Sequence, residues 1–285
     1  MKNILVLFLF IPFATFSQTS NNKLQHKVEE IIKGFNGDIG IYIKSLKTGK
    51  VVQINADTIF PTASIVKVPI LIGIINKINK GELTYHQEET YNDSMLYAGV
   101  DILGSFKNGE KIELSKLIML MLAMSDNTAS LWLQNIAGTG TVINELMDKN
   151  GFTNTKVNSR TPGREYERML YGWGQSTPKE MASIFEKMYK GEIINDSLSK
   201  KMLRLLGRNY WDEEALSEIP ATKFVASKSG AVDASRSEIL LVMAKEPYIL
   251  SVFTKNNKDI SWSYSNEAWV LTRKLSKIVF DYHNR

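Results

Sequence analysis

The chain of 285 residues contains no cysteine. It therefore cannot form disulfides, a thiolate metal site or a lipid-modified cysteine. It has only three histidines, His26, His86 and His283, and no recognisable motif surrounds any of them. A serine–histidine–aspartate hydrolase needs a placed histidine and a metalloenzyme needs clustered ligands, so the sequence argues against both classes. We expect a protein without a metal ion or other cofactor.

Long apolar runs are also missing after the first residues. The one extended run, 4–16, follows Lys2 and precedes Ser17. It is shorter than the roughly 20 residues that a membrane-spanning helix needs. A positive charge, a short apolar core and a small residue together predict a secretory signal peptide over residues 1–17. We expect cleavage after Ser17, a periplasmic or secreted protein, and no stable membrane span after cleavage.

The sequence lacks a basic stripe interleaved with aromatic residues, although its formal net charge is +5. The lysines are scattered along the chain, as on an ordinary solvated surface. A nucleic-acid-binding surface would concentrate them, so we expect no nucleic-acid partner. A mild preference for anionic small molecules fits the charge, and nothing in the sequence indicates an oligomeric state.

Internal repeats and low-complexity linkers are absent, and the periodicity of apolar residues divides the chain into blocks. Both ends favour strands, predicted as a hairpin at 38–55 with its turn at Lys47-Thr48-Gly49 and as single strands at 223–232, 237–244 and 248–254. The middle favours helices at 64–77, 114–134 and 178–189. Two terminal helices are predicted at 22–35 and 263–282.

These elements predict an α+β fold with two lobes in residues 18–285. Strands from both chain ends form one antiparallel sheet, covered by the terminal helices, in a lobe of residues 22–61 and 209–285. Residues 62–208 form an all-α insertion beside that lobe. A cleft between two such lobes is a natural site for a ligand.

Three short motifs follow one another along the chain. They are Ser64-Ile65-Val66-Lys67, Ser125-Asp126-Asn127 and Lys228-Ser229-Gly230. Ser64 and Lys67 are three residues apart at the start of an apolar helix, so their side chains share one face and can touch. The second motif is expected where one helix ends or another begins. The third continues a predicted strand and can present its lysine at a strand edge.

Two further copies of these patterns have a different context. Ser197-Leu198-Ser199-Lys200 repeats the first motif, but it lies in a polar stretch with no apolar helix behind it. Lys47-Thr48-Gly49 resembles the third motif, but it is expected in the turn of the hairpin. We therefore assign neither copy to the site.

The ordered set of three motifs resembles the signature of class A β-lactamases and penicillin-binding proteins, the penicillin-recognising serine hydrolases. The separations of 61 residues from Ser64 to Ser125 and 103 from Ser125 to Lys228 are similar to those of class A enzymes. The likeness covers nearly all of residues 18–285 and implies the two-lobe fold described above. It further implies a serine hydrolase that forms an acyl-enzyme and acts on a β-lactam or related acyl compound.

The resemblance implies roles in acyl transfer. Ser64 would be the nucleophile, but a serine hydroxyl is weak at neutral pH and needs an adjacent base. Lys67 can act as that base if burial and a neighbouring positive charge lower its pKa, and Lys228 can supply the charge. Ser125 would relay a proton to the leaving nitrogen.

Substrate-binding residues are implied in the same way. Asn127 would position Lys67 and the substrate amide, and Lys228 would attract a substrate carboxylate. The backbone N–H groups of Ser64 and Ala231 would form the oxyanion hole. The full predicted set is Asn127, Lys228, Ser229, Gly230, Ala231 and Arg236. For Arg236 two interpretations stay open, contact with the substrate carboxylate or a surface arginine paired with Glu238.

A class A β-lactamase also needs a glutamate that activates the water for hydrolysis of the acyl-enzyme. Glu165 and Glu167 are both available, and the following Met and Tyr-x-Trp pattern favours Glu167. The loop is shorter than in class A enzymes, and Met169 and Tyr171 stand where an asparagine is expected four residues later. The alternative is that both glutamates only pair with neighbouring arginines.

Two other functions stay open. The scaffold also fits a penicillin-binding D-Ala-D-Ala-type carboxypeptidase or another acyl hydrolase, in which the acyl-enzyme persists or carries a different acyl group. An inactive binding module is the non-enzymatic alternative. Decay of function would be expected to break at least one motif, whereas all three are intact. Labelling of Ser64 by an acylating probe distinguishes the enzyme from the binding module.

Overall fold

The computed structural model describes residues 22–97, 99, 102–207 and 209–285. The predicted signal peptide, 1–17, lies outside the described residues. Within the described part of the chain, no helix is both long enough and apolar enough to cross a membrane.

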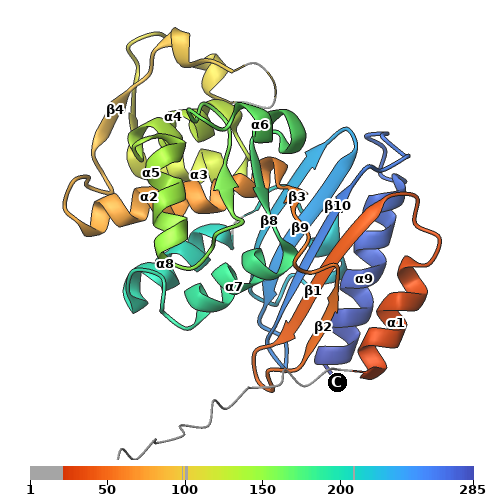
Figure 1. Cartoon of the computed structure of the whole chain (residues 1–285). Helices are drawn as coiled ribbons and strands as arrows, with labels where there is room; N and C mark the ends of the chain where they lie inside the picture. Colours follow the sequence, from red (N-terminus) through yellow and green to blue (C-terminus); the bar gives the residue numbers. More distant parts are fainter. Residues whose placement is uncertain (1–21, 98, 100–101, 208) are drawn as a thin grey trace, which may run out of the picture.

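A five-stranded antiparallel sheet made from both ends of the chain forms one lobe (Figure 1). Its order is β2 (Val51–Ile54), β1 (Asp38–Ser45), β10 (Tyr248–Lys255), β9 (Ser235–Val242) and β8 (Val225–Val232). The first and last strands of the chain pair along their whole length, from Asp38 opposite Lys255 to Ser45 opposite Tyr248. The predicted sheet is therefore confirmed, with β8 as the edge strand nearest the helical lobe.

The terminal helices α1 (Asn22–Ile32) and α9 (Glu267–His283) lie side by side on one face of the sheet (Figure 1). Their apolar faces pack with alternate residues of the strands, so this half of the core is one continuous apolar cluster. Buried members include Leu24, Val28, Leu240, Leu250 and Leu275. The α+β architecture expected from the sequence is confirmed by this arrangement.

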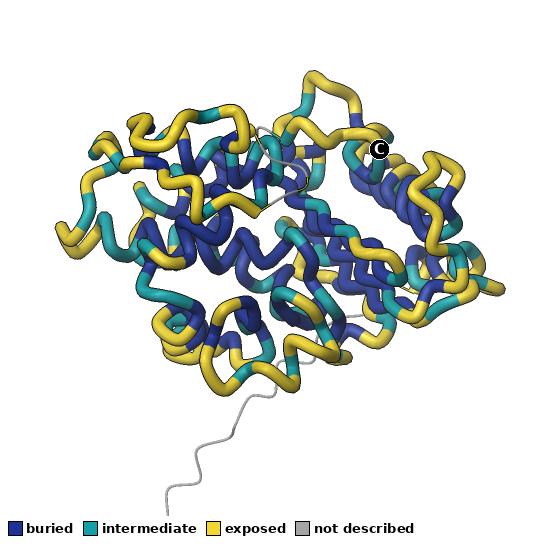
Figure 2. Tube along the Cα trace, turned by 90° about the horizontal axis from the view of Figure 1, so that it is seen from above, coloured by how far each residue is buried: buried dark blue, intermediate teal, exposed yellow. Residues whose placement is uncertain are grey.

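The helical lobe covers the other face of the sheet. Its central helix, α2 (Lys67–Asn79), is buried over most of its length, as the dark core in Figure 2 illustrates. Around it lie α3 (Leu114–Ala123), α4 (Asn127–Ile136), α5 (Thr139–Lys149), α7 (Pro178–Tyr189) and α8 (Asp196–Leu206). Helix α7 contacts both β1 and β10, which joins the two lobes.

Short strands interrupt the helical lobe, which the sequence predicted to be entirely α. The strands β3 (Phe60–Pro61), β7 (Gly174–Ser176) and β6 (Lys156–Val157) form one small sheet, and β4 (Glu88–Thr90) pairs with β5 (Lys111–Glu113). Four 3-10 helices, η1 (Ala63–Val66), η2 (Asp93–Met95), η3 (Leu103–Ser105) and η4 (Ala215–Glu218), and the helix α6 (Glu165–Tyr171) complete the described elements. These strands are only two or three residues long, too short to leave a periodic signal.

Two local predictions are wrong. The predicted helix 114–134 is two helices, because Ser125 adopts φ = 57° and Asp126 caps a new helix. The stretch around Ser197 and Lys200 is not a polar segment without a helix but part of the amphipathic helix α8. Lys200 nonetheless lies on its exposed face, paired with Asp196 at 2.7 Å, so this copy of the first motif takes no part in a site.

Candidate active site

The first motif lies where β3 turns into η1 and then into α2. Lys67 is the first residue of α2, one turn after Ser64, and its Nζ lies 2.9 Å from Ser64 Oγ. Ala63 has φ = 43°, a left-handed conformation that is unfavourable for a residue with a Cβ atom. The Thr62 N–H donates to the Gly174 carbonyl at 2.9 Å and helps to hold the turn. Ser64 is thus presented from a constrained backbone.

The amine of Lys67 is the centre of the hydrogen-bond network, and its side chain is completely buried. Besides Ser64 Oγ, its Nζ contacts Ser125 O at 2.6 Å, Ser125 Oγ at 2.9 Å and Asn127 Oδ1 at 3.1 Å. Burial lowers the pKa of Lys67 well below its usual value, and the Lys228 ammonium group lowers it further. A larger fraction of Lys67 is therefore neutral than of an exposed lysine at the same pH, and the neutral amine can accept the Ser64 proton.

Ser125 occupies the break between α3 and α4. Its hydroxyl lies between two lysines, 2.9 Å from Lys67 Nζ and 3.1 Å from Lys228 Nζ. A hydroxyl both donates and accepts hydrogen bonds. In this position it can pass a proton between an amine and a substrate atom.

The other two residues of the second motif differ in their surroundings. Asp126 is completely buried and accepts from Ala129 N at 2.7 Å and Ile102 N at 2.5 Å, so it fixes a loop to the first turn of α4. Asn127 accepts from Lys67 and borders the pocket beside Ser64. Only the second of these side chains faces the site.

The third motif lies on β8. Lys228 is completely buried, and its Nζ donates to Ser125 Oγ and, at 3.0 Å, to Ser229 O. Burial lowers its pKa to about 8, while the carboxyl of Glu238 acts in the opposite direction. Glu238 lies opposite Ser229 on β9, and burial raises its pKa to about 8 as well. The charge on Lys228 is therefore sensitive to pH near 8.

Gly230 allows β8 to approach the nucleophile. A Cβ atom at this position would lie 2.3 Å from the Thr62 carbonyl oxygen and 2.9 Å from the Ser64 backbone nitrogen. No larger residue fits so close to that backbone. The next residue, Ala231, lines the pocket together with Ser64, which brings the two backbone segments of the expected oxyanion hole to the same pocket.

A pocket of about 220 Å³ opens beside the nucleophile. It is lined by Ala63, Ser64, Tyr97, Asn127, Tyr171, Gly172, Trp173, Ala231 and Val232. A neighbouring pocket of about 330 Å³ shares Tyr171, Gly172 and Val232 with it. A larger pocket of about 890 Å³ lies between α3 and α8, but it contains none of the motif residues that face Ser64. Size alone therefore does not identify the site.

Three aromatic residues of this pocket, Tyr97, Tyr171 and Trp173, did not enter the sequence-based site. The rings of Tyr97 and Trp173 meet edge to face with centroids 5.0 Å apart. Trp173 belongs to the Tyr-x-Trp pattern that favoured Glu167, so the sequence did contain a weak signal that this tryptophan lies near the site. Tyr97 lies in a connection without periodicity, and no sequence signal pointed to it.

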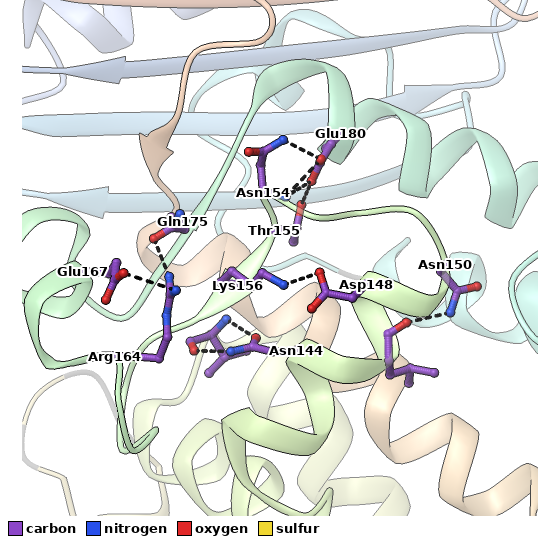
Figure 3. Close-up of polar contacts among 12 residues, drawn as sticks. Asn144, Asp148, Asn150, Asn154, Thr155, Lys156, Arg164, Glu167, Gln175 and Glu180 are labelled. Carbon is purple, nitrogen blue, oxygen red and sulfur yellow. Dashed lines mark hydrogen bonds and ion pairs between the residues drawn. The ribbon is translucent and has the colours of Figure 1, made fainter.

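Glu167 lies on α6, beside the pocket lining but not in it. Its carboxylate pairs with Arg164 at 3.4 Å (Figure 3). Its carbonyl oxygen is 3.5 Å from Asn158 Nδ2. Arg164 also donates to Asn158 Oδ1 at 2.9 Å and Gln175 Oε1 at 2.8 Å. The pairing of Glu167 with an arginine matches the alternative interpretation, whereas the Glu165 carboxylate accepts from the backbone of Gly163.

The structure contradicts one of the two interpretations of Arg236, a surface arginine paired with Glu238. Its side chain is fully buried, so it is not a surface arginine, and no ion pair joins it to Glu238. The guanidinium donates to the carbonyls of Val232, Asp233, Ser235 and Ser261. Its face stacks on the Trp262 ring at 4.4 Å. These contacts close the β8–β9 turn, and the pocket beside Ser64 does not include Arg236.

The geometry places a nucleophile, a buried amine and a bridging hydroxyl within hydrogen-bond distance. Among the described residues, no three His, Asp or Glu side chains cluster as metal ligands do. A model of the β-lactamase enzyme family matches residues 23–283. The chain belongs to this β-lactamase family. It is a serine β-lactamase-like hydrolase.

Relatives within the family include β-lactamase VEB-1 of Pseudomonas aeruginosa, which is 25% identical to this chain over 302 residues. That similarity covers 99% of this chain and 98% of VEB-1. Beta-lactamase SME-1 of Serratia marcescens is 22% identical, covering 82% of this chain and 81% of that protein.

Solved structures share the fold of this chain. PBP-A superposes with a TM-score of 0.82 at 20% identity, covering 93% of this chain and 97% of PBP-A. A mutant of PBP-A in an acyl-enzyme complex with penicillin G superposes with a TM-score of 0.81 at 21% identity and the same coverage. At these identities the likeness shows the fold and leaves the reaction to be argued from the site.

Proposed function

We propose that the protein is an exported serine hydrolase that opens the β-lactam amide through an acyl-enzyme on Ser64. One observation carries the proposal. The buried amine of Lys67 lies 2.9 Å from the hydroxyls of both Ser64 and Ser125. A base beside the nucleophile and a relay beside the base are the two groups that acylation by an amide requires.

Acylation begins with transfer of the Ser64 proton to neutral Lys67 as Oγ attacks the amide carbon. The carbonyl oxygen gains negative charge and is held by the backbone N–H groups of Ser64 and Ala231. The amide C–N bond then breaks, and Ser125 donates its proton to the leaving nitrogen while it takes one from the Lys67 ammonium group. Lys67 returns to the neutral state, and the acyl group remains on Ser64.

The substrate binds along the edge strand β8. Lys228 carries a positive charge below its pKa of about 8 and attracts a substrate carboxylate. Ser229 lies next to it on the strand, and Gly230 leaves the room for a backbone approach. We do not assign the carboxylate to Arg236, because its guanidinium is buried among carbonyl groups of the chain.

Hydrolysis of the acyl-enzyme needs an activated water molecule, and we assign this role to Glu167. The Glu167 carboxylate pairs with Arg164 at 3.4 Å, and Glu167 is not one of the residues that line the pocket beside Ser64. A carboxylate held by an arginine must leave that partner before it can bind and activate a water molecule. We therefore propose that deacylation is the slow step of turnover.

The same observation favours one second candidate, a penicillin-binding carboxypeptidase or another acyl hydrolase. If Glu167 stays with Arg164 throughout the reaction, a β-lactam acylates Ser64 and is not released. The physiological acyl donor is then a different compound, such as a peptide ending in D-Ala-D-Ala. The structural likeness to PBP-A, whose mutant was solved as an acyl-enzyme with penicillin G, accords with this candidate.

The test is hydrolysis of a penicillin by the purified protein, followed by the absorbance of the β-lactam, with Ser64→Ala as the control. Consumption of many equivalents by the wild type and none by the variant supports the β-lactamase. Consumption of a single equivalent together with release of D-alanine from a D-Ala-D-Ala peptide supports the carboxypeptidase. Failure to react with either compound, with Ser64 unlabelled, would leave an inactive binding module.

A further inference from the structure

The C-terminal end of α3 is capped by a distant segment of the chain. The backbone N–H of Tyr210 donates to Ala123 O at 3.0 Å, and the indole Nε1–H of Trp211 donates to Met124 O at 2.8 Å. The last carbonyl groups of a helix have no partner within the helix, so they need donors from elsewhere. Here the donors come from residues that follow α8.

The two capped peptide groups lead directly into Ser125. The C=O of Met124 belongs to the same peptide plane as the Ser125 nitrogen, so the indole contact fixes the orientation of that plane. Ser125 itself has φ = 57°. A serine in this conformation costs free energy and persists only where its surroundings hold it. The caps at Ala123 and Met124 are contacts that hold it.

The same segment also reaches the strand that carries Lys228. The Asn209 side chain donates from Nδ2 to Ser227 Oγ at 3.4 Å and accepts from Trp211 N at 3.2 Å. Ser227 directly precedes Lys228 on β8. Residues 209–211 therefore connect Met124, which precedes the second motif, with Ser227, which precedes the third.

Beyond this bridge, the chain is anchored to the sheet lobe. Ala215 donates its N–H to the buried carboxyl of Glu238 at 2.8 Å and accepts from Ser276 Oγ at 2.6 Å. Glu214 pairs with Arg273 of α9 at 2.5 Å. The segment is thus attached at one end to a rigid helix and strand, and at the other end to the backbone of the site.

We propose that Trp211 is a positioning residue for Ser125 in the acylation reaction, a role that rests on the proposed function. It acts through the peptide of Met124 and touches no substrate atom. The indole contact keeps the Ser125 hydroxyl between the amines of Lys67 and Lys228, where it can protonate the leaving nitrogen. Small displacements of such groups cost large factors in rate.

The proposal makes the effect of Trp211 depend on the leaving group. An amide nitrogen must be protonated to leave, whereas a nitrophenolate leaves without a proton. Trp211→Phe keeps an aromatic ring and removes only the indole donor. We expect it to slow acylation by a penicillin about 10- to 100-fold, in line with the usual contribution of a positioned acid. Acylation by a p-nitrophenyl ester should change less than about threefold, because that step does not need Ser125.

Two comparisons separate the loss of positioning in Trp211→Phe from a general effect of replacing a tryptophan. Trp262→Phe alters another exposed tryptophan, outside the site, and should leave both rates unchanged. In a double-mutant cycle, Trp211→Phe should add little to Ser125→Ala, because both variants remove the same function. Equal slowing of the ester and the amide by Trp211→Phe, or additive effects in the cycle, would overturn the proposal.

Hydrogen exchange supplies a readout that needs no substrate. The Asp126 N–H donates to Leu120 O at 3.1 Å, across the turn that the caps hold. In Trp211→Phe the amides of Ser125 and Asp126 should exchange at least about fivefold faster, while those of α9 should not change. Unchanged exchange contradicts the positioning role even if the proposed function is right. Faster exchange in a protein that no penicillin acylates supports the positioning of Ser125 and counts only against the proposed substrate.

Discussion

The amine of Lys67 lies 2.9 Å from Ser64 Oγ, and the Lys67 side chain has no contact with solvent. A buried amine is costly to charge, and a second buried lysine, Lys228, increases that cost. The same two features that oppose protonation of Lys67 therefore make it a base for Ser64. Burial of Lys67 beside Lys228 thus destabilises the ammonium form, and this is what makes the amine a base for Ser64.

Replacement of the base tests this relationship directly. Lys67→Met keeps a long unbranched side chain and removes the amine, so we expect acylation of Ser64 by a penicillin to slow by at least about 100-fold. The matched control is Lys200→Met, in the second Ser-x-x-Lys sequence, where the side chain is 61% exposed. That variant should acylate at the wild-type rate. A Lys67→Met variant with wild-type acylation would contradict the assignment of Lys67 as the base.

The two lysines predict a bell-shaped pH profile for acylation. Because the pKa of Lys67 is lowered, its neutral form grows as pH rises through that pKa, so kcat/KM falls on the acid side. On the alkaline side, Lys228 loses its charge above its pKa of about 8, and KM for a substrate with a carboxylate should rise. Measurements of kcat/KM from pH 5 to 10 give both limbs. Lys228→Gln should abolish the alkaline limb, and its survival in that variant would count against Lys228 as the carboxylate site.

Glu167 is tested by the lifetime of the acyl-enzyme. Glu167→Gln should leave acylation within about threefold of the wild type and slow deacylation by at least about tenfold, because it removes a general base. Glu165→Gln, two residues earlier on α6, is the matched control and should deacylate normally. Equal deacylation in the wild type and Glu167→Gln would mean that Glu167 only pairs with Arg164, as its contact at 3.4 Å allows.

Arg236 is predicted to stabilise the fold and not to bind substrate. Arg236→Met removes the four hydrogen bonds that the buried guanidinium donates to the carbonyls of Val232, Asp233, Ser235 and Ser261. A hydrogen bond from a charged group contributes about 1.5–3 kcal/mol to stability. We expect the free energy of unfolding in urea to fall by about 2–4 kcal/mol. KM for a penicillin should change little where the variant is folded. An unchanged free energy of unfolding with a raised KM would show instead that Arg236 reaches the substrate.

Much of the fold could be predicted because its signals are local. Ile39, Ile41 and Ile43 alternate along β1 and are buried, while the turn at Lys47-Thr48-Gly49 closes the hairpin. The first motif was also a local signal, since a spacing of three on an apolar helix brings Ser64 and Lys67 together. The prediction and the structure agree for β1, β2 and the start of α2. Helix α8 was missed although Met202, Leu203 and Leu206 give it a buried face at helical spacing.

The features that were missed depend on contacts between distant residues. The run before and after Ser125 has one continuous helical period. The break next to it is held partly by Trp211, which donates to Met124 O from 87 residues further along the chain. Arg236 is two residues from Glu238 on a strand, which made a pair plausible, but the carbonyls that bind it include Ser261 in another loop. No local pattern records these choices.

The central claim is that Ser64 forms an acyl-enzyme that Lys67 makes possible. The most direct measurement is the intact mass of the purified protein over time after addition of a penicillin, with Ser64→Ala as the control. We predict an adduct of the mass of the drug that forms on the wild type, clears more slowly than it forms, and is absent from the variant. The absence of any adduct on the wild type with every β-lactam tried, or an equal adduct on Ser64→Ala, would contradict the account.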